Sequence, residues 1–247
     1  SKEIATDDPD NNARYIGANP NNYVSFNNEF WRIIGVMNNI DDGTGKKEIR
    51  LKIIRNEPYS TGMAWDTDNV NDWSQASLQQ ELNTTYLNSI TSPSKEIIRN
   101  TLWNLGGLSS YSYPTSTFYS SERRATVVSG HPATWISSIG LMYPSDYGYA
   151  TSGGSTGRET CLSYNLGGWS GDCYSNNWLY KSGISQWTLT PYSTNSLGVF
   201  SVDSYGNVHN SSANYPNTAV FPTLYLSSNV KITGGDGSKT NPFTLSL

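Results

Sequence analysis

The alternation of apolar and polar residues predicts antiparallel strands near the start of the chain. Residues 23–37 read YVSFNNEFWRIIGVM, in which two apolar runs flank Asn27-Asn28, a pair that tolerates the positive φ of a tight turn. Another apolar run, IRLKIIR at 49–55, follows a loop rich in turn residues. We therefore expect a β-hairpin at 23–37 and a strand at 49–55 that pairs with it antiparallel.

Helical periodicity follows in the next fifty residues. Asp72 is a suitable N-cap for a first helix. Ser92-Pro93 opens a second helix, because proline in the first turn lacks only an amide that would be unpaired there, and Gly106-Gly107 ends it. The apolar stripes that should face the core are Leu78, Leu82 and Tyr86 in the first helix, and Ile97, Ile98, Thr101, Leu102 and Leu105 in the second.

From Tyr111 onward no helix is predicted, and short apolar runs alternate with loops. The runs lie at 139–142, 186–189, 199–202, 221–226 and 230–233. Residues 204–207, SYGN, predict a hairpin turn, and 145–180 a long loop segment that we expect to be ordered. The pattern favours one α+β domain over 23–247, with two helices in its first half and a loop-rich second half.

Residues 1–22 are polar and rich in turn residues, which predicts an arm or linker leading into the domain. The sequence starts without a signal peptide, so either the protein is cytoplasmic or an export or anchor segment has been removed, and the composition favours the second alternative. Membrane contact would then come only through a missing N-terminal helix, since no run of about 18 apolar residues is present.

Composition narrows the function classes. The 247 residues carry a net charge of -4 and only 15% charged side chains, so no basic stripe is available for nucleic acid. Lys46-Lys47 and Arg123-Arg124 are isolated pairs that we expect to be solvated surface. The 17 Tyr and 8 Trp among many neutral polar residues are typical of extracellular β-rich surfaces and of binding faces.

The order of the segments resembles a known family. IGLMYPSDYGYAT at 139–151, WTLTPYS at 187–193 and FPTLYL at 221–226 succeed one another as in an uncharacterised family of surface-protein domains from gut Firmicutes and related bacteria. Many members carry a prepilin-like N-terminal helix. The resemblance covers the chain from about Asp8 onward and implies an extracellular, cell-surface-anchored location.

That family is similar to the C-type-lectin-like fold, which includes bacterial surface modules, formylglycine-generating enzymes and retroelement-diversified variable proteins. The resemblance therefore implies a C-type-lectin-like single domain with antiparallel sheets. Its terminal strand often reads G-V-R-P-x-L-Y-L, whereas this chain has Ala219 and Phe221 in place of the usual Gly and Arg. The replacement puts the role of that arginine in question here.

The two cysteines, Cys161 and Cys173, have three interpretations. A disulfide closing a loop of about a dozen residues, with glycines that let the chain fold back, would stabilise by roughly 3 kcal/mol. A metal site lacks the C-x2-C spacing and a nearby His. A catalytic pair would need a neighbouring cation, and only Arg158 lies in the ten residues before Cys161, while Asp172 opposes it. We predict the disulfide.

Other candidate chemistry is weak. His131 and His209 lie near no nucleophile motif, and no carboxylate pair is singled out for glycoside chemistry. The acidic loops 7–10, 41–43 and 235–237 suit turn chemistry and leave Ca²⁺ as an open alternative, with no other cofactor indicated. Trp178, Leu179 and Trp187 are expected in the core. We therefore expect a non-enzymatic protein.

The residues most suited to a ligand are aromatic and amide side chains in loops 145–180 and 192–217. Flat apolar faces next to amide groups suit a carbohydrate or a protein partner. The interpretation is an extracellular ligand-binding or adhesion domain on a bacterial surface or pilus. Its alternatives are a formylglycine-generating-type thiol enzyme and a structural pilin-like subunit. The predicted ligand-binding residues are Trp169, Tyr174, Asn176, Asn177, Tyr192, Asn195, Tyr205, Asn207 and His209.

Overall fold

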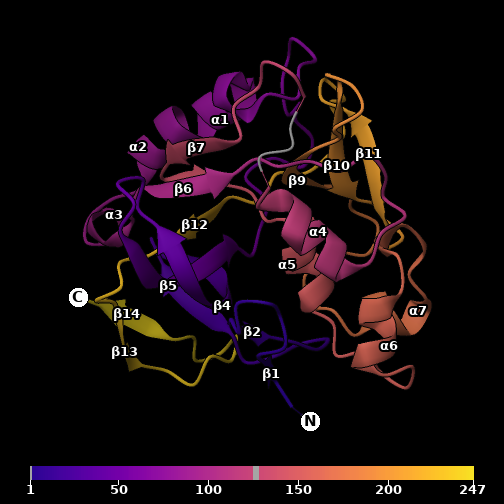
Figure 1. Cartoon of the computed structure of the whole chain (residues 1–247). Coiled ribbons are helices and arrows are strands. Elements are labelled where there is room, and N and C mark those ends of the chain that lie inside the picture. Colours follow the sequence, from indigo (N-terminus) through magenta and orange to yellow (C-terminus); the bar gives the residue numbers. More distant parts are fainter. Residues whose placement is uncertain (1, 125–127) are drawn as a thin grey trace.

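A seven-stranded antiparallel sheet is the largest element of the computed structural model, which describes residues 2–124 and 128–247 (Figure 1). Its strands follow the order β1-β2-β4-β5-β12-β8, and β3 pairs with β4. The strands are β1 (Ile4–Ala5), β2 (Ala13–Tyr15), β3 (Tyr23–Phe26), β4 (Glu29–Asp41), β5 (Lys47–Arg55), β8 (Ile139–Gly140) and β12 (Thr223–Tyr225).

The predicted first hairpin is confirmed. Strands β3 and β4 pair antiparallel across Asn27 and Asn28, whose φ angles of 54° and 55° are the positive values expected of this turn. Strand β5 then pairs antiparallel with β4, also as predicted.

The first predicted helix is confirmed in position but is divided. Asp72 accepts a hydrogen bond from the Ser74 amide and caps a short 3-10 helix, η1 (Trp73–Gln75). Ala76 is extended, and helix α1 (Ser77–Glu81), a π-helical turn η2 (Leu82–Tyr86) and α2 (Leu87–Ser89) follow. The expected stripe of Leu78, Leu82 and Tyr86 is buried.

The second predicted helix is wrong beyond its first turn. Helix α3 (Ser94–Ile97) ends early, and β6 (Thr101–Asn104) pairs antiparallel with β7 (Thr134–Ser137). Burial alternates along β6, as it does in a half-buried strand, and the buried Trp103 ring packs 5.1 Å from the Tyr225 ring. The cross-sheet aromatic contact favours the strand over the local helical pattern.

The prediction of no helix after Tyr111 is also wrong. The structure contains α4 (Thr115–Glu122), α5 (Pro144–Tyr149), α6 (Arg158–Ser163) and α7 (Gly171–Ser175). Helices of five to eight residues are only marginally stable through their helix propensity, so tertiary packing must stabilise them. Gly148 permits α5 to pack closely against α4, because a Cβ there would lie 2.2 Å from the Thr115 Oγ1.

A second sheet, in the order β11-β10-β9, is formed by β9 (Gln186–Pro191), β10 (Gly198–Val202) and β11 (Val208–Ser212). The predicted hairpin turn at 204–207 joins β10 to β11. A two-stranded sheet, β13 (Lys231–Gly234) with β14 (Thr244–Ser246), lies near the C-terminus. Each of the five predicted apolar runs of the second half thus holds a strand. Helices α4 and α5 lie between the large sheet and the β9–β11 sheet (Figure 1).

The segment expected to be an arm belongs to the fold instead. Strand β2 pairs with β4, and Asp8, Asn12 and Arg14 are buried. The Asp8 carboxylate accepts hydrogen bonds from the Asn12 amide at 3.0 Å and from the Arg14 Nε at 2.7 Å, which fixes this segment against the sheet. Within 2–124 and 128–247, no helix has the length and apolar character needed to cross a membrane.

Candidate functional site

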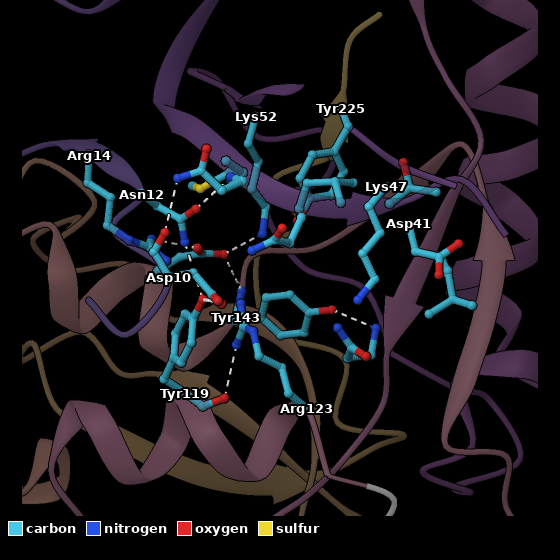
Figure 2. Close-up of a pocket in the computed structure, with 18 residues that line it drawn as sticks. Asp10, Asn12, Arg14, Asp41, Lys47, Lys52, Tyr119, Arg123, Tyr143 and Tyr225 are labelled. Carbon is cyan, nitrogen blue, oxygen red and sulfur yellow. Dashed lines mark hydrogen bonds and ion pairs between the residues drawn. The ribbon is translucent and has the colours of Figure 1, made fainter. Parts of the chain in front are cut away.

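A cavity of about 310 Å³ lies where the N-terminal segment, the β4–β5 hairpin and helices α4 and α5 meet (Figure 2). Its wall is mainly charged, amide and phenol side chains. Figure 2 shows Lys52 and Lys47 of β5 on one side and Tyr119 and Arg123 of the α4 end on the opposite side. Other lining residues are Asp10, Asn12, Arg14, Asn38, Asn39, Asp41, Asn104, Tyr143, Asp146 and Tyr225.

Asp146 in the first turn of α5 connects the buried charges of this site. Its carboxylate accepts hydrogen bonds from Lys52 Nζ at 2.7 Å, from Arg14 Nη1 at 2.9 Å and from the Tyr143 amide at 2.8 Å. Burial alone would raise the pKa of Asp146, but the charges of Lys52 and Arg14 hold it well below its usual value. Asp146 is therefore an anion that two cations share.

Lys52 is almost completely buried, with 1% of its side chain exposed. Its ammonium lies 4.5 Å from the Tyr143 ring centroid, 5.0 Å from that of Tyr225 and 5.6 Å from that of Trp103. Burial lowers the pKa of Lys52 to about 8, because the loss of water outweighs the attraction of Asp146. At neutral pH Lys52 is a cation with one carboxylate partner.

The end of α4 supplies a second pair of opposite charges. Glu122 is fully buried and accepts hydrogen bonds from the amide and the hydroxyl of Ser145. Burial raises the pKa of Glu122 to about 7, although Arg123 opposes the shift. Arg123 lies over the Tyr119 ring at 3.4 Å and lines the cavity, so the expectation that it is plain solvated surface is wrong.

Each carboxylate of the cavity wall accepts at least one hydrogen bond. Asp146 has three donors, Asp10 accepts from the Tyr119 hydroxyl, and the Asp41 carboxylate accepts from the Gly43 and Gly45 amides at 2.8 and 3.1 Å.

Several donors of the wall are unused by the described residues. Lys47 makes no hydrogen bond to them, Lys52 uses one of its three N–H groups, and Arg123 donates through Nη1 alone. The Nη2 of Arg14 is buried and has no hydrogen-bond partner among the described residues. Four cations line the cavity against three carboxylates, and several of their N–H groups are unused, so the cavity favours a ligand with a negatively charged acceptor group.

Sequence reasoning missed this site, although one signal was present. In strand β5 the side chains of residues 50, 52 and 54 share a face, and Arg50, Lys52 and Ile54 are all buried. A lysine and an arginine at the inward positions of an apolar strand indicate buried charges that need partners. The partners, Asp146 on α5 and Thr101 on β6, were not identifiable from the sequence.

Two of the predicted ligand-binding residues are inside the domain. Trp169 is 5% exposed, its Nε1 donates to the Cys161 carbonyl, and its ring packs 5.2 Å from that of Tyr147. Asn177 is 3% exposed and donates to the Tyr147 carbonyl. Their side chains hold the loop segment together, so the expectation that they face a ligand is corrected.

The other predicted residues except Asn176 separate into two groups at opposite ends of the β9–β11 sheet. Tyr192 and Asn195 belong to the β9–β10 connection, whereas the second group surrounds the β10–β11 turn. At that turn Tyr205 is 76% exposed and His209 packs 4.7 Å from the Tyr111 ring. Five strand residues span about 13 Å, so the two groups do not form one compact site. The group at the turn comprises Tyr174, Tyr205, Asn207 and His209, whereas Asn176 lies apart from it, against Gly154 and Asp172.

The predicted disulfide is confirmed. Cys161 of α6 and Cys173 of α7 are bonded, with 5.5 Å between their Cα atoms, and both are fully buried. The bond joins the two short helices of the loop segment. Neither sulfur is a free thiol.

The acidic loops have the turn chemistry that was expected. The carboxylates of Asp41 and Asp236 each accept a hydrogen bond from the backbone amide two residues later. The Asp8 carboxylate accepts hydrogen bonds from Asn12 and Arg14. Within the described ranges, no group of three or more His, Cys, Asp or Glu is placed to hold a metal ion. Trp178, Leu179 and Trp187 are buried, as predicted.

Comparison with family models, with curated proteins and with solved structures finds no match for this chain.

Proposed function

We propose that this chain is an extracellular ligand-binding domain of C-type-lectin-like fold, displayed on a bacterial surface or pilus, which holds a carboxylate of its ligand in the cavity beside Lys52. The observation that carries the proposal is the set of unused N–H donors on Lys47, Lys52 and Arg123, in a wall whose four cations outnumber its three carboxylates. The cavity replaces loops 145–180 and 192–217 as the main binding site.

The size and charge of the cavity support a small anionic group. Ligand pockets in proteins have volumes of roughly 300–1,000 Å³, and this one has about 310 Å³. A carboxylate between Lys52 and Arg123 would receive charge-assisted hydrogen bonds, which are about twice as strong as neutral ones. It would also give Lys52 a second anion in a site where water has been removed.

The state of the two cysteines favours binding over the thiol chemistry that was the alternative. The sulfurs of Cys161 and Cys173 are joined and buried, so no thiolate is available as a nucleophile. Disulfides persist in oxidising compartments, which agrees with the extracellular location that we propose.

The test is a titration with matched carboxylate and amide compounds. Glucuronate and glucuronamide share a sugar ring, as propionate and propionamide share an ethyl group, and each pair differs in a single negative charge. Binding is followed by NMR at the amide of Asn104, which donates to the Tyr143 hydroxyl at the cavity wall. We expect the carboxylates to shift this resonance and the amides to need at least tenfold higher concentrations.

Variants assign the effect to the cavity. Lys47→Gln removes an exposed cation at the rim and should weaken carboxylate binding without a loss of stability, whereas Lys52→Met should abolish binding. Lys239→Gln, at an exposed loop position, is the matched control and should change nothing. Equal affinity for carboxylates and amides, or equal binding by all three variants, would overturn the proposal.

A further inference from the structure

The cavity continues into an open groove on the surface. A second depression of about 330 Å³ shares Asp10, Asn38, Asn39 and Lys47 with the cavity and extends to Asn11, Glu48 and Ile49. The shared residues form the boundary between the two spaces. A ligand with one end in the cavity can therefore continue along the hairpin end of β4 and β5.

The groove differs from the cavity in its chemistry. Of its three charged members, Glu48 pairs with Lys46 at 2.8 Å and with Arg50 at 3.0 Å, and Asp10 and Lys47 carry opposite charges. Amides at positions 11, 38 and 39 line it, and an amide both donates and accepts hydrogen bonds. Such a surface suits a neutral, hydroxyl-rich chain, because each hydroxyl is also both donor and acceptor.

The apolar part of the groove is small. Ile49, which is 56% exposed, is the apolar residue that lines it, whereas a lipid or an apolar peptide would need a continuous apolar surface. Asp10 and Glu48 also disfavour a polyanion, since carboxylates along the whole length of a ligand would lie beside them. The negative charge of the ligand therefore belongs at its end, in the cavity.

We propose that the ligand is the acidic end of an oligosaccharide: one carboxylated sugar occupies the cavity, and a neutral sugar follows in the groove. This inference rests on the proposed function. The cavity and the groove have similar volumes, about 310 and 330 Å³, so the groove has room for one unit about as large as the terminal one.

The test compares ligands of different length. Methyl glucuronide is titrated beside a disaccharide that has glucuronate at its non-reducing end followed by N-acetylglucosamine. We expect the disaccharide to bind about tenfold more tightly than the monosaccharide. A trisaccharide in which the glucuronate lies between two N-acetylglucosamine units, and is therefore not terminal, should bind no better than the monosaccharide.

Two conservative variants separate the groove from the cavity. Asn11→Gly removes an exposed amide, and glycine accepts the positive φ of 54° at this position. Ile49→Thr removes apolar surface and keeps a β-branched residue in the strand. Each should reduce the tenfold advantage of the disaccharide to threefold or less, while the affinity for methyl glucuronide stays unchanged.

The outcomes distinguish this inference from the function on which it rests. If the monosaccharide binds and the disaccharide has no advantage, the groove proposal fails and the carboxylate site stands. If neither sugar binds at millimolar concentration while propionate does, the carboxylate site stands and the sugar assignment fails. If a peptide with a free C-terminal carboxylate gains affinity with length and the sugars do not, the groove binds protein and the inference is overturned.

Discussion

Lys52 keeps one carboxylate, that of Asp146, within 2.7 Å, and its other neighbours are mainly aromatic rings. Removal from water lowers the pKa of this ammonium group to about 8, so the group titrates within the pH range of ordinary buffers. The charge on which we base the proposed function is thus sensitive to pH. Arg14 and Arg123 also face this region, but their guanidinium groups stay charged throughout the range in question.

The first prediction concerns this proton. Carboxylate binding should weaken up to tenfold per pH unit above about pH 8, as Lys52 loses its charge. Titrations of glucuronate from pH 6 to 9.5 measure the effect. Lys52→Arg should remove the pH dependence, because arginine does not titrate there.

Lys47→Gln provides the control for this experiment. It removes a charge at the rim, so it should weaken binding equally at every pH and leave the step near pH 8 in place. Affinity that stays constant up to pH 9.5 in the unmodified protein would contradict a role for the Lys52 ammonium.

At the scale of elements, the strands were easier to predict than the helices. The hairpin at Asn27-Asn28 depends on local turn chemistry and on an apolar pattern, both of which are readable in the sequence. Helices α4 to α7 depend on contacts made elsewhere: α5 needs Lys52 and Arg14 for its Asp146, and α6 and α7 need their disulfide. Strand β6 was mistaken for helix because Trp103 finds its partner, Tyr225, more than a hundred residues later.

The contact between α4 and α5 leads to the second prediction. Gly148→Ala would place a methyl group 2.2 Å from Thr115 Oγ1, so the helices must separate. We expect a loss of about 1–3 kcal/mol in the free energy of unfolding, the usual cost of overpacking. Gly171→Ala in α7 is the matched control, since its nearest neighbour would lie 3.6 Å away. Urea denaturation of both variants measures the difference, and equal stability would show that α4 and α5 are not in close contact.

At the scale of the whole molecule, the cavity is assembled from segments that are far apart in the sequence. Its cations come from β2, β5 and the end of α4, and its shared carboxylate from α5. Periodicity identifies inward-facing positions within one element, but not which elements meet. The sequence was therefore sufficient to predict an α+β domain with a disulfide. It was not sufficient to predict the site, because Asp146 pairs with Arg14, 132 positions away, and with Lys52, 94 positions away.

The buried charges around α4 and α5 also affect the stability of the whole domain. Glu122 has a pKa of about 7 in the folded state, against an ordinary value of 4.5. A carboxyl whose pKa is raised by folding binds more protons in the folded state, so its contribution to stability is present below pH 4.5 and is lost as pH rises through 7. The full change in the free energy of unfolding is about 3 kcal/mol, because each unit of difference between the folded and unfolded pKa is equivalent to about 1.4 kcal/mol.

The third prediction follows from this loss of stability with rising pH. Glu122→Gln cannot ionise, so it should be similar to the unmodified protein at pH 4.5 and more stable than it at pH 8, by up to about 3 kcal/mol. Urea denaturation at half-unit intervals between these values gives the difference curve, in which all other titrating groups cancel. Glu159→Gln, an exposed carboxyl of α6, is the control and should give a flat difference. A flat curve for Glu122→Gln as well would mean that Glu122 stays ionised in the fold, held by Arg123 and Ser145.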